Sequence, residues 1–460
     1  MSAALFGFRA GARLAAALLV LTCLPSAAQG FGEDPRENEA PMICHGDAEG
    51  ARALLRQGLD NYVALMSARD ISVIAPRVDR PVESAADWLR AHAPRDAIIF
   101  FGRSGERHCA YLVDRNGMAG FGAAAASASA LSQALDAWRA SANIDAPARG
   151  RRAAVSRSAP AMAQVAARIP SGPRPGRASL EYLAQTLFPG EIRAKMLQYH
   201  HLYLLPYGDL GEVPYAALPA GVGDTQIIDY ATVSIAPNLN VFLGEDVAPR
   251  STQTRLCNAR SPGQSALIVG NPAAPQDAEW SFPNLPGAER EAGQVAQTLN
   301  VTPLVGAAAT SDRFLERAAQ ARIVHLASHG IASTSDPLNA SFLVFADGRL
   351  TASRIQRTCV PARLVVLSAC QTGLGRAHAG GIIGLARAFQ IASADEVITS
   401  LWSVDDEVTE RLMTRFWSIY ARGDVTAADA LRAAMLEVRR TDPNPRLWAA
   451  FVVFGAPGAT

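Results

Sequence analysis

Two short segments restrict the fold of this chain more than any other part of its sequence. Residues 323–330 have the sequence IVHLASHG, and residues 364–373 have the sequence LVVLSACQTG. Each is an apolar run that passes into a small polar turn with glycine, which is typical of a buried parallel strand ending in a loop. Two such strands side by side would place His329 and Cys370 at one edge of a sheet, where open α/β sheets bind ligands. An imidazole beside a thiol is the minimum that a thiolate nucleophile needs.

From about residue 178 onward, short apolar segments alternate with longer amphipathic ones. Besides the two segments above, the pattern predicts strands at 202–205, 266–269, 396–402 and 449–454, and helices at 180–187, 288–299, 311–319, 384–392, 406–420 and 426–440. This alternation indicates an α/β fold with a mostly parallel central sheet and helices on both faces. Nearer the N-terminus we expect helical structure over 47–95, strands at 97–101 and 108–113, and a helix at 127–142.

Composition sets broad limits on size and on partners. The 460 residues suffice for one large or two ordinary domains, and with 49% hydrophobic residues the chain can bury a sizeable core. A net charge of +1 argues against a nucleic-acid partner.

The first 28 residues carry the features of a secretory signal peptide. Arg9 and Arg13 precede the apolar run 14–21, and small residues follow at 25–28. We therefore expect cleavage near residue 28 and export to the periplasm or the medium. The run is too short to span a bilayer as a stable helix, and no later segment has transmembrane character. An uncleaved N-terminal anchor is the alternative.

Three further parts are predicted after the signal peptide. Residues 29–145 form an N-terminal α+β region, and 146–177, rich in Ala, Arg, Pro and Ser, form a linker or an insertion. Residues 178–460 form the α/β core. The sequence contains no internal repeat of 20–50 residues.

Export would make disulfides possible. Removal of Cys23 with the signal peptide leaves five cysteines, so at least one thiol is unpaired within a monomer. Our hypothesis is that Cys370 is the free one, which is compatible with bridges Cys44–Cys109 and Cys257–Cys359. The sequence does not determine the pairing, and five buried free thiols are the alternative.

A family resemblance rests on several ordered motifs. They are HLASHG at 325–330, LSACQTGLG at 367–375, GLARAF at 384–389, SLWSVDD at 400–406 and WAAF at 448–451, with LPYGDLGEVPYAAL at 205–218, GNP at 270–272, LPGAE at 285–289 and LTASRI at 350–355 upstream. Over about 180–458 the chain resembles a CHAT domain, a family of caspase- and separase-like cysteine peptidases. The resemblance implies a caspase-like α/β sandwich in which residues 178–460 are the CHAT domain. It also implies that His329 and Cys370 are the catalytic dyad.

The proposed chemistry explains why these residue types are needed. A thiol with a pKa of about 8.5 is only slightly ionised at neutral pH, and a neighbouring imidazole accepts its proton and later protonates the leaving amine. The backbone N–H groups of Gly330 and Cys370 are candidates for the oxyanion hole. The alternatives are an inert turn histidine at His329 and a structural thiol at Cys370.

Two acidic residues, Asp405 and Asp406, follow the predicted strand 396–402. In separase-like relatives an acidic residue in this region binds a basic side chain before the cleaved bond. The resemblance therefore implies that Asp405 or Asp406 lies in the substrate pocket, where a carboxylate pairs well with Arg or Lys. Capping of the helix that starts near Glu407 is the alternative, and one residue of the pair can serve each purpose.

The remaining histidines have less specific contexts. His325 lies four residues before His329 and either supports the site or is a core histidine. His378 belongs to a glycine-rich segment and is expected in a loop. His200 and His201 lack partners at the spacing of a metal site, so we interpret them as structural and predict no metal.

The small hydroxyl residues of the two motifs raise the alternative of a serine hydrolase. No G-x-S-x-G sequence surrounds Ser328, Ser368 or Thr372, so we interpret them as packing residues. The glycine-rich segment 374–384 lacks the Lys and Ser/Thr of a phosphate loop, and we expect no cofactor.

Together these features predict an exported cysteine endopeptidase that acts through a thioester, on a protein or peptide substrate, with a preference for basic residues. A non-catalytic or gated caspase-like interaction module is the alternative. A related thiol-dependent acyl transfer, such as peptide ligation, shares the thioester.

Overall fold

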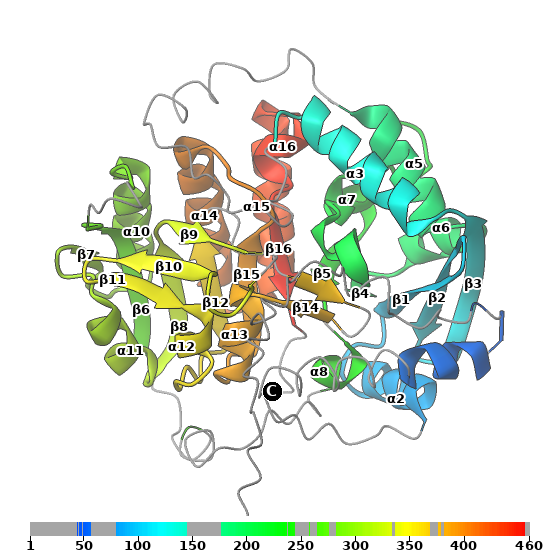
Figure 1. Cartoon of the computed structure of the whole chain (residues 1–460), viewed down its shortest axis with the longest axis horizontal. Coiled ribbons are helices and arrows are strands. Elements are labelled where there is room, and N and C mark those ends of the chain that lie inside the picture. The colour runs from blue at the N-terminus through cyan, green and yellow to red at the C-terminus, as the bar shows by residue number, and fades with distance from the viewer. Residues whose placement is uncertain are drawn as a thin grey trace, which may run out of the picture. The chain divides into compact units, whose positions relative to one another are not determined.

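The described strands pair mainly into one large sheet, in the order β3-β2-β1-β4-β5-β16-β15-β12-β8-β6-β7 (Figure 1). The fold is that of a computed structural model, which describes residues 44, 46–47, 49–56, 80–144, 176–236, 238–243, 257, 265–275, 282–333, 336–368, 376–378 and 381–455. Seven of the ten neighbouring strand pairs are parallel. The predicted mostly parallel sheet is therefore confirmed.

The strands of this sheet are short and mostly buried. Their bounds are β1 Ala97–Ser104, β2 Arg107–Asp114, β3 Gly117–Ala125, β4 His201–Leu205, β5 Thr232–Ile235, β6 Ser265–Pro272, β7 Leu304–Gly306, β8 Ala321–Ala327, β12 Leu364–Ser368, β15 Glu396–Ser400 and β16 Phe451–Phe454. A second small sheet contains β9 Gly330–Ile331, β10 Phe342–Phe345 and β11 Gly348–Thr351, and a hairpin contains β13 Arg376–His378 and β14 Gly381–Ile383. All residues of β12 and β15 are buried, as expected for central parallel strands.

The helices cover both faces of the sheet, as predicted. Their bounds are α2 Pro81–His92, α3 Ala128–Ser141, α5 Arg177–Leu187, α6 Ile192–Lys195, α7 Ile227–Tyr230, α8 Leu239–Phe242, α10 Pro286–Thr298, α11 Ser311–Ala318, α12 Ala352–Ile355, α13 Leu385–Ile391, α14 Asp406–Tyr420, α15 Ala427–Thr441 and α16 Pro445–Trp448, with 3₁₀ turns η2 Met196–Gln198, η3 Gly208–Glu212 and η4 Tyr215–Ala217. Figure 1 shows α10, α14 and α15 on one side, where they contact one another, and α11, α12 and α13 on the other.

The sheet has two halves that run in opposite directions. In one half β1, β4, β5 and β16 are parallel, and in the other β15, β12, β8, β6 and β7 are parallel. The halves meet where β16 lies antiparallel to β15. Consequently, the carboxyl ends of β8, β12 and β15 share one edge of the sheet.

Strand pairing also connects the predicted N-terminal region with the predicted core. β1 lies parallel to β4, so segments on the two sides of the predicted linker 146–177 belong to one sheet. The domain boundaries themselves stay predictions. The signal peptide and nearly all of the linker lie outside the described residues.

The sequence missed some strands. β3 was not predicted because its Gly- and Ala-rich sequence, GMAGFGAAA, lacks the β-branched residues that mark a strand. The segment around His378 was expected to be a loop, yet β13 and β14 pair there as a hairpin. Of the helical structure expected over 47–95, the structure describes a helix at 49–56 and α2.

Two disulfides settle the pairing that the sequence left open. Cys44 is bonded to Cys109, and Cys257 is bonded to Cys359. Cys23 and Cys370, the other two cysteines of the chain, lie outside the described residues. In the described part of the chain, no helix has both the length and the apolar character needed to cross a membrane.

Candidate active site

The predicted neighbourhood of the His329 and Cys370 strands is confirmed. β8 and β12 lie side by side and parallel, with Ala327 opposite Ser368 as the last pair of the register. In the sequence, His329 is the second residue after Ala327 and Cys370 is the second residue after Ser368. Cys370, like the rest of 369–375, lies outside the described residues. The described half of the candidate site is therefore the histidine side.

A backbone carbonyl holds the His329 ring at the end of β8. The Nε2 atom of His329 lies 2.7 Å from the carbonyl oxygen of Pro283. Because a carbonyl oxygen only accepts hydrogen bonds, Nε2 carries the hydrogen, and in the neutral ring Nδ1 is left as the acceptor. The ring of Phe282 packs at a tilt against that of His329, with 5.2 Å between centroids.

The electrostatic surroundings favour the neutral form of this histidine. Burial lowers the pKa of His329, and this effect outweighs the hydrogen bond to Pro283 and the negative charge of Asp406, which both raise the pKa. A neutral imidazole with an unprotonated Nδ1 is the form that accepts a proton from a thiol.

The amide of Gly330, a candidate oxyanion-hole donor, is not used in the pairing of β9 with β10. β9 and β10 pair with Gly330 opposite Leu343, and the N–H of Val344 donates to the carbonyl of His329. In this antiparallel pattern Gly330 is a non-hydrogen-bonded position, so its own N–H points away from β10. Ser328 Oγ donates to the carbonyl of Val344 at 2.7 Å, which fits its predicted packing role.

The two candidate pocket carboxylates have different positions. Asp405 caps α14, since its Oδ1 accepts the N–H of Glu407 at 3.0 Å and that of Val408 at 3.4 Å. Asp406 reaches the N-terminus of α10 instead, where its Oδ2 accepts the N–H of Gly287 at 2.7 Å. Burial raises the pKa of Asp406. Only Asp406 thus lies close enough to His329 to affect its charge.

His325 is a buried histidine directly beneath the candidate site. Its Nε2 lies 2.8 Å from Oε1 of Glu291 on α10, and its Nδ1 accepts the Nε1–H of Trp417 on α14 at 3.2 Å. Burial raises the pKa of Glu291, which also neighbours Ser368, the last residue of β12. His325 is therefore a core residue that connects β8 to α10 and α14.

His201 and His200 lie at and next to β4, several strands away from β8. His201 is buried on β4 and its Nε2 contacts Ser234 Oγ at 2.9 Å. His200 lies 3.8 Å from Asp96 and 3.5 Å from Asp429. His378 belongs to β13. Within the described ranges, no group of three or more His, Cys, Asp or Glu side chains is arranged to hold a metal ion.

Comparison with known proteins agrees with this arrangement. The family model of the CHAT domain matches residues 177–456, which is more than half of the chain. The chain belongs to the CHAT domain family. In sequence it is 26% identical over 301 residues to tetratricopeptide repeat protein 28 of Homo sapiens, covering 56% of this chain and 12% of that protein. The Mus musculus protein of the same name is 26% identical over 307 residues, with the same coverage of each chain. This CHAT chain therefore matches only a small part of these long relatives.

A solved structure supports the caspase-like fold. The Saccharomyces cerevisiae separase, in its complex with securin, superposes with a TM-score of 0.51 at 10% identity, covering 88% of this chain and 33% of that chain. The predicted caspase-like sandwich is confirmed at the level of the fold.

Several CHAT motif residues prove to be structural. Trp402 packs edge-on against Trp138 at 5.1 Å and its Nε1 donates to the carbonyl of Arg446 at 2.9 Å. Gly270 lies near the end of β6, where a Cβ atom would lie 2.3 Å from the Cβ of Ala292, so only glycine lets α10 approach the strand this closely. Sequence reasoning identified these residues only as parts of a family pattern.

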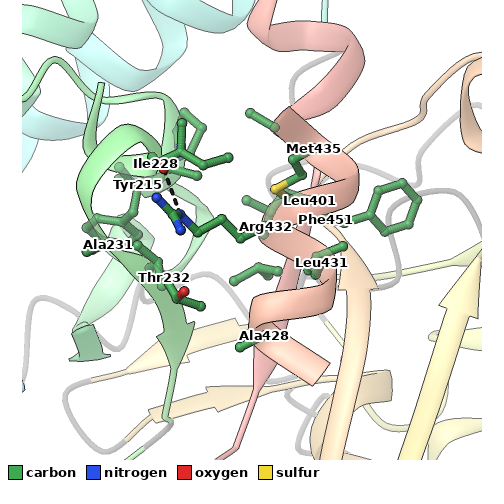
Figure 2. A pocket seen from close by; sticks show the side chains of 16 residues that line it. Tyr215, Ile228, Ala231, Thr232, Leu401, Ala428, Leu431, Arg432, Met435 and Phe451 are labelled. Atoms are coloured by element: carbon green, nitrogen blue, oxygen red, sulfur yellow. Dashed lines mark hydrogen bonds between the residues drawn. The ribbon is translucent and has the colours of Figure 1, made fainter. Parts of the chain in front are cut away.

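A pocket lies elsewhere, between α7, β5 and α15 (Figure 2). Apolar residues form most of its wall, and Arg432 extends across it to donate to the carbonyls of Ile228 and Asp229 at 2.8 and 3.0 Å. β16, at the rim, is three strands from β8, roughly 14 Å at the usual strand spacing. The pocket is therefore separate from the His329 site, and Arg432 links α15 to α7 across it.

Proposed function

We propose that this CHAT protein is an exported cysteine endopeptidase with a dyad of Cys370 and His329. One observation carries the proposal: the imidazole of His329 lies at the end of β8 with Nε2 bonded to Pro283, so that Nδ1 is the basic atom. The register that pairs Ala327 with Ser368 supports a thiol at Cys370 close to this atom.

In the proposed reaction His329 moves a proton twice for each acyl transfer. Nδ1 takes the proton of the Cys370 thiol, and the thiolate attacks the peptide carbonyl carbon. The N–H groups of Gly330 and Cys370 stabilise the oxyanion, and the imidazolium gives its proton to the leaving amine as the C–N bond breaks. Water, deprotonated by the same nitrogen, then attacks the thioester carbonyl, and the C–S bond breaks to regenerate the thiol.

We assign the preference for basic residues before the cleaved bond to Asp406. Two observations support this: its charge acts on His329, and burial raises its pKa. A carboxylate that is partly desolvated gains most from an incoming guanidinium or ammonium group. Asp405 caps α14 and, unlike Asp406, is not among the groups that act on the pKa of His329.

The disulfides support the proposed export. Cys44–Cys109 and Cys257–Cys359 are the kind of bond that forms and persists in oxidising compartments and is rare in the cytosol. Sequencing the N-terminus of the exported protein tests the cleavage: a start near residue 29 supports it, and a start at Met1 contradicts it.

A mixture of proteome-derived peptides tests the catalytic proposal. We expect the purified protein to produce new peptide termini, mostly after Arg or Lys. Cys370→Ala should abolish them, and His329→Ala should slow their formation by a factor on the order of 10² to 10⁴. His92→Ala, in which the altered residue is exposed on α2, is the matched control and should keep full activity. Turnover confined to acidic or apolar residues would refute the assigned role of Asp406.

The second candidate function, which applies if no peptide is cleaved, is that of a non-catalytic interaction module. The sequence relatives are tetratricopeptide repeat proteins, of which the matched region is a small part. If wild type and Cys370→Ala behave alike on every peptide, and Cys370 reacts no faster than a simple thiol, the interaction module is the better assignment.

A further inference from the structure

The carbonyl that holds His329 belongs to an exposed loop. Pro283 and Asn284 are exposed, and only Phe282, at the start of the described segment, is buried against Phe342. Exposed loop residues without packing contacts are free to move unless hydrogen bonds hold them. The position of the Pro283 oxygen therefore depends on the polar contacts of residues 284–287.

One side chain makes two of these contacts and a third with α10. Asn271, buried at the end of β6, accepts the N–H of Leu285 through Oδ1 at 3.0 Å. Its Nδ2 donates to Asn284 Oδ1 at 2.8 Å and to Glu289 Oε2 at 3.0 Å. A single amide thus binds the loop residue next to Pro283, the following residue and the first turn of α10.

The backbone of Asn271 is adapted to this task. Its φ is +43°, in the left-handed region that asparagine tolerates better than other non-glycine residues. This conformation coincides with a shift in the pairing register of β6 between Gly270 and Pro272, and the side chain faces the loop. The GNP motif at 270–272 is too short for a phosphate loop, and these contacts supply its physical reason.

Asp406 holds the other side of the same loop. Its bond to the Gly287 N–H links the start of α10 to the start of α14. A Cβ atom on Gly287 would lie 2.2 Å from Asp406 Oδ2, so glycine is required for this contact. The segment between Phe282 and Gly287 is therefore fixed from β6 and from α14.

We propose that Asn271 is a positioning residue for the dyad, because it holds the Pro283 carbonyl against Nε2 of His329 and so directs Nδ1 toward the nucleophile. The catalytic part of this inference rests on the proposed function, whereas the effect on the His329 ring does not. Asp406 is the charged group that acts on His329, in addition to the neutral carbonyl of Pro283. Glu289 is the charged group that contacts Asn271.

Asn271→Gly is the informative variant. Glycine accepts a φ of +43° without strain, so the strand end is kept while all three side-chain contacts are lost. Asn300→Gly is the matched control, since Asn300 also has a positive φ, +54°, but is exposed at the far end of α10. Asn271→Asp is a second variant that keeps an acceptor for Leu285 but no donor for Asn284 and Glu289.

Two measurements separate this proposal from the proposed function. The first is the proton NMR signal of the His329 Nε2–H in ¹⁵N-histidine-labelled protein, assigned by its loss in His329→Asn. The second is the rate at which iodoacetamide alkylates Cys370, followed by mass spectrometry from pH 5 to 9. We expect wild type and Asn300→Gly to show a slowly exchanging Nε2–H signal. In Asn271→Gly the signal should be lost, and alkylation at pH 7 should slow about tenfold. Asn271→Asp should change both in the same direction.

The outcomes have distinct meanings. If Asn271→Gly keeps the Nε2–H signal and the alkylation rate of Asn300→Gly, the positioning role is wrong. If the signal depends on Asn271 but wild-type Cys370 is no more reactive than a simple thiol, the loop contact stands and the peptidase assignment fails.

Discussion

Glu396, the first residue of β15, provides a quantitative test of the structure. Its carboxyl is almost fully buried, and Oε1 has no hydrogen-bond partner among the described residues. Burial raises the pKa of Glu396 from 4.5 to about 7. The sign follows from linkage: an acid whose pKa is raised by folding contributes its stability below pH 4.5 and loses it as the pH rises toward 7.

The size of the effect follows from the same values. The interval between 4.5 and about 7 corresponds to about 3 kcal/mol of unfolding free energy, most of which is lost between pH 5 and pH 8. Glu396→Gln keeps the shape but cannot ionise, so it removes this pH dependence. Relative to wild type, the variant should therefore gain about 2–3 kcal/mol when the pH is raised from 5 to 8. Since β15 begins at the edge opposite the candidate site, the substitution should leave Cys370 reactivity unchanged.

Urea unfolding at pH 5 and pH 8, followed by circular dichroism, measures the difference. The comparison between two variants cancels every other titrating group of the chain. Glu437→Gln, at an exposed position on α15, is the control and should follow wild type at both pH values. If wild type and Glu396→Gln lose or gain stability in parallel, the buried carboxyl does not ionise in this range and the calculation is refuted.

Two other substitutions test the site loop and the disulfides. Gly287→Ala places a Cβ atom 2.2 Å from Asp406 Oδ2. We therefore expect the unfolding free energy, measured in urea, to fall by about 1–3 kcal/mol and the alkylation of Cys370 to slow. Unchanged values would contradict the described contact. Replacing Cys257 and Cys359 together by Ser removes a bond that joins residues 102 positions apart. Chain entropy predicts that the unfolding free energy falls by about 4–5 kcal/mol. Equal stability of the wild type with and without reductant would argue against the bond in solution.

The fold was predictable because its signals are local. The apolar runs of β8, β12 and β15 are continuous, as buried parallel strands require, and Thr310 and Asp405 cap α11 and α14 as helix-start signals predict. The adjacency of β8 and β12 was predicted because both apolar runs end in a small polar turn with glycine. β3 was missed because glycine and alanine carry almost no periodic signal.

The support of the site was not predictable, since it depends on contacts between distant segments. Pro283 acts through its carbonyl, a group that every residue has, so no side-chain pattern marks it. Glu291 lies on a helix face that appears merely charged in the sequence, yet it is buried against His325. Asp406 was considered for a substrate pocket or a cap of α14, and its contact with the Gly287 N–H at the start of α10 was not foreseen. An asparagine that follows an apolar run and a glycine is the sequence signal that would have pointed to Asn271.

The contacts around His329 explain how a histidine at a strand end keeps a defined orientation. The strand that precedes His329, β8, is bonded through His325 to Glu291 on α10 and to Trp417 on α14. The ring of His329 is bonded to the carbonyl of Pro283, in the loop that leads directly into α10. Both supports therefore converge on one helix, whose N-terminus is bonded to Asp406 at the start of α14. A shift of α10 would therefore alter the contact of His325 with Glu291 and the contact of His329 with Pro283 together.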